Sequence, residues 1–455
     1  GTTLTFTSAP EDDDTIHVRY LGRTLDVSQT AIVQDTDQDT KIQVEESADE
    51  DTIRFDVAGA EDFTMTANDF TALSGSTIST NTIAETTSGS GVTIDGLLIK
   101  DGAVANVTGK NLINNGAMTV DQRAGETRTG LGAAAAYHFD QWKYTPSGSP
   151  SGRFTLSSGT GLAALGYANS LKVAVTTADD ALAAGALYGF TTYVEAQNLQ
   201  HLKYGLASAE AVTLSFAVIT DTAAEFTAMI IAPDGSRSYS TGYTVSSADT
   251  AQEFSLTFPG DASGTITDNA GRGFEVVFTL AAGSNFRGGT EDAWGAEANN
   301  KYGAGMTSNM FDTNGNYWEI SGVQLEVGSV ATDFEHEAIS QTEQKCDRYY
   351  QRYAYETAYS PVGDGHNLST TQGRVTFYFR QKMRGTPVGS VSNAADFQAQ
   401  DTGGTYDTTV IILTEENANT MLVLFTVASS LNDGDGVRLR TDGTVNRYIE
   451  ASAEL

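Results

Sequence analysis

The chain has 455 residues, of which 40% are hydrophobic and 18% charged, with 46 glycines, 7 prolines and one cysteine. This length predicts about three domains, and the composition favours an all-β fold with glycine-rich turns. A single cysteine excludes an intrachain disulfide, a net charge of −32 argues against nucleic acid as a partner, and no apolar run reaches the roughly 18 residues that membrane insertion needs.

The first predicted element is a β-hairpin within residues 1–30. Residues 1–25 read GTTLTFTSAPEDDDTIHVRYLGRTL, in which apolar and polar residues alternate on both sides of an acidic turn. The segment resembles the end of the virion-attachment domain of podophage-type tail fibres. That resemblance implies that residues 1–30 bind other phage tail or virion proteins, and that further sequence precedes them.

Residues 31–110 are predicted to form a β-rich shaft. Two runs, TKIQVE at 40–45 and TIRFDV at 52–57, alternate with period 2 and look like an imperfect repeat. Strands this short bury little in one chain, so we expect them to be stable when several copies wrap together. The Ser, Thr and Gly-rich residues 70–100 resemble the intertwined shaft of trimeric fibres, and a disordered linker is the alternative.

An acidic cluster within the shaft is the one candidate metal site. Asp35, Asp37 and Asp39 alternate along the chain and offer the oxygen ligands that calcium prefers. The cluster lacks the glycine and the distal glutamate of a complete calcium-binding loop. Structural calcium is therefore only a possible addition to a protein for which we expect no cofactor.

Residues 111–340 contain a series of strand-like runs separated by glycine-rich turns, which predicts two packed antiparallel sheets. The runs are residues 171–175, 189–194, 212–219, 227–231, 253–258, 274–280 and 317–326. Trp142 and Trp318 lie in strand-like surroundings and are expected in the core.

Four segments of this region resemble one known family. Residues 111–125 read NLINNGAMTVDQRAG, 137–142 read YHFDQW, 194–216 end in a TLSF strand, and 323–350 read VQLEVGSVATDFEHEAISQTEQKCDRYY. In this order they resemble the jelly-roll-like, carbohydrate-binding β-sandwich of bacteriophage tail fibres. The resemblance implies a homotrimeric virion protein that recognises surface glycans of the host.

The last part of the chain is predicted to be a short helix followed by a small domain. Residues 341–352 form the helical hinge, with Cys346, Tyr349, Tyr350 and Tyr353 at helical spacing. Residues 353–455 are expected to form a smaller antiparallel β-sandwich. Their closing sequence, YIEASAEL, resembles the end of tail-fibre tip domains, which implies a distal receptor-binding position.

Sugar binding needs flat aromatic faces beside polar groups, so aromatic residues in polar loops are the candidates. The sandwich offers a loop with Trp294, Asn299, Asn300 and Tyr302. The tip domain offers Tyr355, Tyr359, Asp364, His366 and Tyr406, which we expect in or near loops. Loop packing or contacts between subunits are the alternative roles for both sets.

No catalytic motif is recognisable, and the chain is not expected to be an enzyme. The function predicted is that of a phage tail fibre, on the virion and outside the host after lysis, which adsorbs to cell-surface polysaccharide or lipopolysaccharide. The alternatives are a structural virion spike or capsid decoration fibre without glycan binding, a polysaccharide depolymerase, and a bacterial adhesin.

Overall fold

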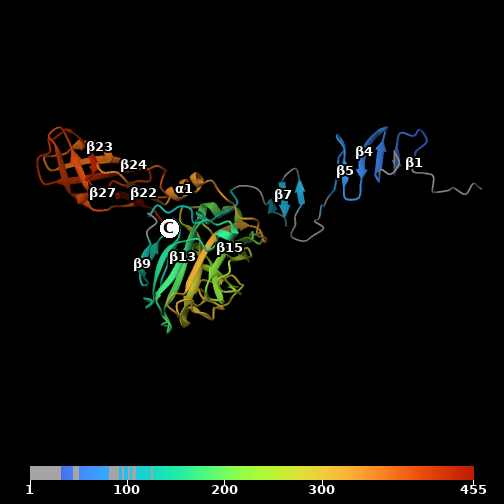
Figure 1. The fold of residues 1–455 in the computed structure, drawn as a ribbon, viewed down its shortest axis with the longest axis horizontal. Helices are drawn as coiled ribbons and strands as arrows, with labels where there is room; N and C mark the ends of the chain where they lie inside the picture. Colours follow the sequence, from blue (N-terminus) through green and yellow to red (C-terminus); the bar gives the residue numbers. More distant parts are fainter. Residues whose placement is uncertain are drawn as a thin grey trace, which may run out of the picture. The chain divides into compact units, whose positions relative to one another are not determined.

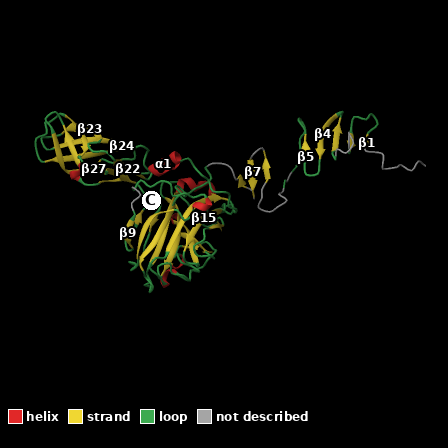
Figure 2. Ribbon diagram, viewed as in Figure 1, coloured by secondary structure: helices red, strands yellow, loops and turns green. Residues whose placement is uncertain are grey.

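The computed structural model describes residues 32–44, 51–80, 83, 92–94, 97–100, 103–104, 109–123 and 127–455. The chain divides into two units, Gly1–Thr86 and Thr87–Leu455. Strands dominate the described part of each unit (Figure 1, Figure 2), which confirms the all-β class. The hairpin predicted within residues 1–30 lies outside the described residues.

The first unit contains a five-stranded antiparallel meander. Its strands, in sheet order, are β1 (Ile32–Gln34), β2 (Lys41–Gln43), β3 (Ile53–Val57), β4 (Ala60–Met65) and β5 (Phe70–Ala72). The two alternating runs predicted at 40–45 and 52–57 are confirmed as the neighbouring strands β2 and β3.

The strand register of this meander gathers apolar side chains on one face. One cross-strand row consists of Val33, Ile42, Phe55, Phe63 and Ala72. Met65 and Phe70 stand two residues along the neighbouring strands and share this face, and the rings of Phe63 and Phe70 stack at 5.5 Å. Yet Val33 is 70% and Phe70 51% exposed, so the described residues of this unit leave the face open to solvent.

The second unit begins with a small sheet and continues into a β-sandwich (Figure 1). The small sheet consists of β6 (Val92–Ile94), β7 (Leu97–Lys100) and β8 (Ala103–Val104). One sheet of the sandwich has the order β10 (Ala136–Tyr137), β11 (Lys143–Tyr144), β14 (Leu187–Glu195), β19 (Arg272–Ala282), β16 (Glu225–Ala232), β17 (Arg237–Thr244) and β20 (Gly295–Ala296). The other has the order β18 (Gln252–Phe258), β15 (Val212–Thr220), β21 (Tyr317–Val327), β13 (Ser170–Thr177), β12 (Arg153–Gly159) and β9 (Arg128–Leu131).

Every strand predicted for the sandwich is present, and the jelly-roll-like architecture of two packed antiparallel sheets is confirmed. Trp142 and Trp318 are both fully buried between the sheets, as expected. The short 3₁₀ turns of this unit are η2 (Ala163–Leu165), η3 (Ala196–Leu202), η4 (Pro233–Gly235), η5 (Ser284–Phe286), η6 (Asn299–Lys301) and η7 (Ala394–Asp396).

Two asparagines connect the sequence segments that carry the family resemblance. The Asn111 side chain accepts the N–H of Leu325 at 3.1 Å and donates to the carbonyl of Val323 at 3.1 Å. The Asn115 side chain donates to the carbonyl of Asp140 at 3.0 Å, and the backbone carbonyl of Asn115 accepts the Trp142 indole N–H at 3.2 Å. The opening segment is therefore bonded to both β21 and the YHFDQW element.

The helix after the sandwich is shorter than the sequence predicts. It is α1 (Ile339–Asp347), and Tyr350 already begins strand β22 (Tyr350–Tyr355). The helical stripe proposed through Tyr350 and Tyr353 is therefore wrong. The backbone of this tyrosine-rich stretch pairs instead with the last strand, β30 (Arg447–Ser452), which a local pattern cannot reveal. None of the helices in the described ranges combines the length and the apolar character that crossing a membrane requires.

The C-terminal region is antiparallel β as expected, but its main sheet is closed. A barrel forms from β23 (Pro361–Asn367), β24 (Gln372–Tyr378), β28 (Thr420–Val427), β27 (Thr405–Thr414), β26 (Phe397–Gln400) and β29 (Gly436–Thr441). A three-stranded sheet of β22, β30 and β25 (Val388–Val391) accompanies it. The expected second sandwich is corrected to a barrel because β29 pairs with both β23 and β26, which closes the sheet.

An ion pair fixes the segment after α1 to the sandwich. The guanidinium of Arg348 donates to both carboxylate oxygens of Glu195, at 2.6 and 2.9 Å. Glu195 ends β14 and is 0% exposed, whereas Arg348 is partly exposed. Arg348 therefore neutralises the buried carboxylate of Glu195 where the sandwich meets the C-terminal region.

We expect Arg348→Met to lower the free energy of unfolding by about 2 kcal/mol, less than for a fully buried pair because Arg348 reaches solvent. Adding Glu195→Gln should recover part of that loss by removing the unpaired buried charge. The control Lys203→Met breaks an exposed ion pair with Glu210 and should change stability by less than about 0.5 kcal/mol. Denaturant unfolding of the wild type and the three variants measures these free energies. Equal losses of stability in Arg348→Met and Lys203→Met would contradict a special role of the buried pair.

Candidate functional site

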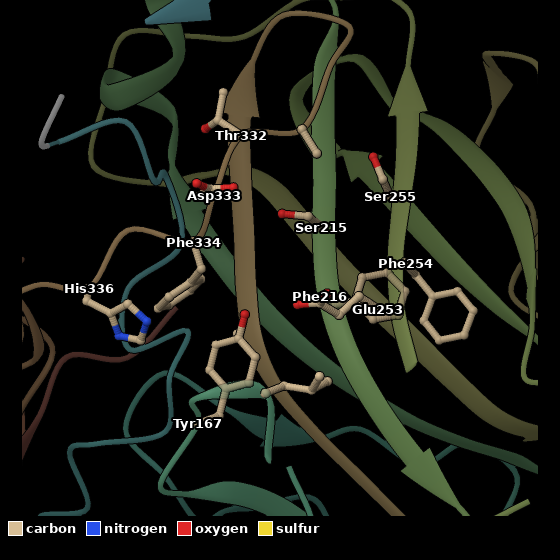
Figure 3. A pocket seen from close by; sticks show the side chains of 13 residues that line it. Tyr167, Ser215, Phe216, Glu253, Phe254, Ser255, Thr332, Asp333, Phe334 and His336 are labelled. Atoms are coloured by element: carbon tan, nitrogen blue, oxygen red, sulfur yellow. The ribbon is translucent and has the colours of Figure 1, made fainter. Parts of the chain in front are cut away.

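A pocket of about 470 Å³ lies on the outward face of the six-stranded sheet. Its floor comes from three adjacent strands, through Ser255 of β18, Ser215 of β15 and Gly322 of β21. Figure 3 shows the two serines on neighbouring strands, to the right of Thr332 and Asp333. Because strand side chains alternate, these residues face away from the core that the same strands cover.

One wall of the pocket is the segment that follows β21 and folds back across the sheet. Its backbone is held by outward side chains of β21. Glu326 accepts both the N–H of Thr332 at 2.8 Å and its hydroxyl at 2.6 Å, and Gln324 accepts the N–H of Glu335 at 2.8 Å. The bonds on either side of Asp333 and Phe334 fix these two residues at the pocket.

Three rings form the apolar side of the pocket (Figure 3). Tyr167 and Phe334 meet edge to face with their centroids 5.4 Å apart, and His336 lies 5.0 Å from Phe334. Tyr167 rests on the backbone of β21, since a Cβ at Gly322 would lie 2.3 Å from its ring. Gly322 also has a φ of +62°, which a larger residue rarely adopts.

Two exposed carboxylates, Glu253 and Asp333, provide the charge of the pocket. Burial raises the pKa of Tyr167 to about 12, and both carboxylates contribute to that rise. The Tyr167 hydroxyl therefore keeps its proton at neutral pH and can donate it in a hydrogen bond. Ring faces beside carboxylate and hydroxyl groups are an arrangement that can bind a ligand with apolar C–H faces and many hydroxyls.

None of the candidate residues chosen from the sequence lines this pocket. The indole of Trp294 donates to the carbonyl of Pro259 at 2.5 Å and meets Tyr204 edge to face at 5.6 Å. Tyr302 is half-buried against Phe286, and burial followed by Glu297 raises its pKa. These contacts match the alternative of loop packing.

The two asparagines of that loop differ from Trp294 and Tyr302 in their exposure to solvent. Asn299 and Asn300 begin the short turn η6 and are exposed. Their side chains remain available on the surface, although no aromatic face of the pocket lies with them.

Most candidates of the C-terminal domain lie on strands, which corrects the expectation of loops. Tyr355 is in β22, Asp364 and His366 are in β23, and Tyr406 is in β27. The glycine-rich residues 361–367 form a strand because they pair with β24 and β29. Asp364 pairs with Arg438 at 2.9 Å on this surface.

Tyr359 is the C-terminal candidate that does lie in a turn. It is 54% exposed, has a φ of +60°, and the guanidinium of Arg440 stands 4.8 Å from its ring centre. An exposed ring held in one orientation could meet a partner, but Tyr359 lines neither the pocket of the six-stranded sheet nor the cleft beside β22.

The acidic cluster forms a local turn. One carboxylate oxygen from each of Asp35, Asp37 and Asp39 lies within 4.8 Å of the others, and all three residues are exposed. Asp35 also accepts the backbone N–H of Gln38 at 3.0 Å. One oxygen from each carboxylate gives three of the roughly six to eight that calcium takes, so a structural calcium stays a prediction.

The sequence gives only a weak signal for the pocket. Phe334 and His336 stand between acidic residues in TDFEHE, within the segment that carries the family resemblance. Tyr167 stands in an ordinary Gly-Tyr-Ala context. Its role depends on contact with Gly322, which lies 155 positions further along the chain.

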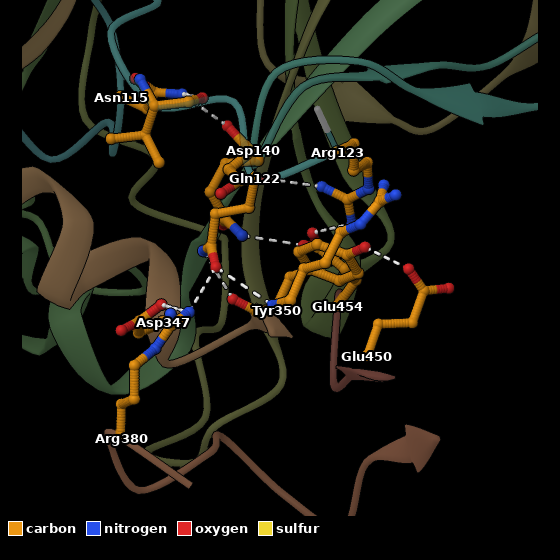
Figure 4. A network of polar contacts seen from close by, with 12 residues as sticks. Asn115, Gln122, Arg123, Asp140, Asp347, Tyr350, Arg380, Glu450 and Glu454 are labelled. Atoms are coloured by element: carbon orange, nitrogen blue, oxygen red, sulfur yellow. Dashed lines mark hydrogen bonds and ion pairs between the residues drawn. The ribbon is translucent and has the colours of Figure 1, made fainter. Parts of the chain in front are cut away.

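A second polar cluster joins the sandwich to the end of the chain (Figure 4). The buried guanidinium of Arg123 donates to Asp140 at 2.8 Å and to Glu454 at 2.8 Å. The ring of Tyr350 lies 3.7 Å from the same guanidinium. Gln141 also donates to Glu454, at 2.8 Å. Two buried carboxylates thus share one cation.

The comparisons with known proteins give structural likeness only. No protein-family model matches the chain, and no curated protein matches it by sequence. Among solved structures, the chain is similar to the enzymatically active domain of tailspike protein 4 from bacteriophage CBA120, at 14% identity and a TM-score of 0.27. That match covers 48% of this chain and 21% of the tailspike chain, so the chain spans about a fifth of that relative's length.

Two carbohydrate-related structures show similar values. The family 11 carbohydrate-binding module of Clostridium thermocellum, in complex with a β-1,3-1,4-mixed-linked tetrasaccharide, has 14% identity and a TM-score of 0.23, with 46% of this chain and 98% of the module covered. An exo-β-agarase has 7% identity and a TM-score of 0.26, with 59% and 40% covered. Each TM-score is below 0.5, so function is argued from the geometry of the chain itself.

The shared cation of the second cluster predicts a pH dependence of stability. Burial, with a contribution from Glu454 and against the attraction of Arg123, raises the pKa of Asp140 to about 7. An unfolded aspartate titrates near about 3.9. Between about pH 4 and pH 7, Asp140 therefore holds a proton in the folded state but not in the unfolded state. The loss of stability that follows from the raised pKa is absent below about pH 4 and complete above about pH 7.

We expect the free energy of unfolding to rise as the pH is lowered from about 8 to about 5, and Asp140→Asn to reduce this slope. The carboxamide keeps the shape but cannot titrate. Denaturant unfolding at several pH values measures both slopes. Identical slopes in the two proteins would show that Asp140 is charged throughout the range.

Proposed function

We propose that this chain is a bacteriophage tail fibre protein whose sandwich binds host cell-surface polysaccharide or lipopolysaccharide. The observation that carries the proposal is the pocket on the outward face of the six-stranded sheet, where Tyr167 and Phe334 lie beside Glu253 and Asp333. Its volume of about 470 Å³ falls within the usual range for small-ligand pockets. The four sequence segments that resemble phage tail fibres support the same function.

The pocket has the chemistry that sugar recognition requires. The apolar C–H face of a pyranose can lie against the aromatic rings, and its hydroxyls can donate to the two carboxylates. Ser215 and Ser255 add hydroxyl partners from the sheet. The role proposed for the carboxylates is hydrogen bonding without hydrolysis, so the protein acts as a binding protein and not as an enzyme.

A homotrimer is part of the proposal, and the first unit supports it. One face of the β1–β5 sheet carries exposed Val33, Ile42, Met65 and Phe70. Exposed apolar surface of this kind is unfavourable in water, and identical faces of three chains can cover one another. Three copies would also raise the avidity of weak sugar contacts through effective concentration.

The remaining elements of the proposal concern placement. The N-terminal end would bind other phage tail or virion proteins, and the C-terminal barrel would be the distal tip. The fibre would act on the virion outside the host after lysis, where it meets the bacterial surface.

To test glycan binding, the full chain would be applied to an array of bacterial surface polysaccharide fragments. For the fragments that bind, we expect Phe334→Ala and Glu253→Gln each to weaken the affinity at least about tenfold, because each removes a direct contact with the sugar. Isothermal titration calorimetry measures the change.

Tyr378→Ala is the matched control, because it removes a 72% exposed aromatic ring of the barrel without touching the pocket. Equal weakening by all three variants would place the sugar elsewhere. If the wild-type chain binds no fragment, a purely structural spike is supported, and release of reducing ends from a fragment would support a depolymerase.

To test assembly, sedimentation of the wild-type chain should show three copies. We expect the double variant Val33→Ser, Phe70→Ser to shift the population to smaller species, since it lowers the apolar area that the copies bury. Gln34→Ser alters the neighbouring position on the opposite face of β1 and should leave the trimer intact. A monomeric wild-type chain would overturn the homotrimer.

A further inference from the structure

A second cleft, of about 690 Å³, lies where the sandwich meets the C-terminal sheet. One side is the edge of the sandwich, with Arg128 of β9, Tyr137 of β10 and Lys143 of β11. The other side is one face of β22 and β30, with Arg352 and Tyr448. It is a different cavity from the pocket described above, with which it shares no lining residue.

The cleft is basic in a protein that is strongly acidic. The chain has 26 lysines and arginines against 58 aspartates and glutamates, so positive charge is scarce. Arg128, Lys143 and Arg352 nevertheless line one cavity, and no carboxylate oxygen among the described residues lies within 4.0 Å of their basic nitrogens. Three unpaired cations around one cavity are therefore a local exception to the charge of the whole chain.

Two of these cations also have hydrogen-bond donors without partners. The Nε atoms of Arg128 and Arg352 are buried and bond to no other group. The guanidinium of Arg352 is held 3.8 Å from the ring centre of Tyr448, which fixes its plane. A buried donor without an acceptor is unfavourable, and an anion in the cleft would supply the missing acceptor.

The one carboxylate that lines the cleft is already engaged. Glu450 accepts hydrogen bonds from the hydroxyls of Ser390, at 2.6 Å, and Tyr350. The fourth cation, Arg123, is neutralised from behind by Asp140 and Glu454. These hydroxyl donors leave the charge of Glu450 in place, so the cleft sets the cations of Arg128, Lys143 and Arg352 against one carboxylate and stays positive.

Two arginines that line the cleft, Arg128 and Arg123, act on the neighbouring His138. Its pKa is lowered to about 4, first by burial and then by Arg128 and Arg123. A histidine that resists protonation is consistent with a locally positive environment.

We propose that this cleft binds an anionic sugar residue, through a carboxylate or sulfate group on the glycan. Arg128, Lys143 and Arg352 would pair with the anionic group, and the rings of Tyr137 and Tyr448 would border the sugar. The inference rests on the proposed glycan-binding function and adds a second site with its own ligand class. Arginine suits this role because its planar fork matches the geometry of such anions.

The test uses the full-length chain and two anionic probes, hexagalacturonate for carboxylate and a κ-carrageenan hexasaccharide for sulfate, with neutral cellohexaose as reference. At about 0.15 M salt, charges more than about 8 Å apart are largely screened, so the overall negative charge interferes little. We expect at least one anionic probe to bind, and the double variant Arg128→Gln, Arg352→Gln to weaken it at least tenfold. The probe that binds identifies the anionic group.

Lys203→Gln removes one positive charge from an exposed pair outside the cleft and should change the affinity less than twofold. Neutral fragments that bind the pocket near Phe334 should bind the double variant as they bind the wild type, which separates failure of this inference from failure of the proposed function. Absence of binding by both anionic probes would overturn the inference, as would unchanged binding by the double variant. A variant that sediments as fewer copies than the wild type would also overturn it, because the cleft would then be an interface between chains.

Discussion

The described sandwich depends on two asparagine side chains that bond backbone groups from distant parts of the chain. Asn111 pairs with the backbone of β21 at Val323 and Leu325, and Asn115 pairs with the carbonyl of Asp140. An amide side chain has both donors and acceptors, so it can satisfy buried backbone groups that no strand reaches. Gly116 fits the same place, because a Cβ there would lie 2.0 Å from the carbonyl oxygen of Val323. These contacts explain why the opening, aromatic and closing segments occur together.

The elements that follow from local pattern could be predicted from the sequence. Central strands such as β15 and β19 alternate or are continuously apolar, and each was expected within a few residues. The end of α1 and the closure of the barrel could not be predicted, because both depend on pairing with strands far along the chain. Tyr350 is the clearest example, since its spacing suits a helix and its pairing with Ser452 makes it a strand.

The candidate site was harder to predict than the fold, for a related reason. Trp294 is an aromatic residue in a polar loop, a pattern that predicts sugar contact. Its indole is instead bonded to the carbonyl of Pro259 and packed on Tyr204. Tyr167 and Phe334 form the pocket only because Glu326 draws the return segment across the sheet. A pocket formed by such a segment can be predicted from the sequence only when the residue that bonds the segment, here Glu326, is already known.

The pocket and the basic cleft both lie outside the packed interior between the two sheets. The pocket is built from a segment that returns over the six-stranded sheet, and the cleft from short strands at the margins of the two sheets, namely β9, β10 and β11. Loops and edges tolerate substitution better than the core does. The residues that choose a ligand could therefore change while the Asn111 and Asn115 contacts stay fixed. Under the glycan-binding function proposed above, this separation would allow new specificity without a new fold.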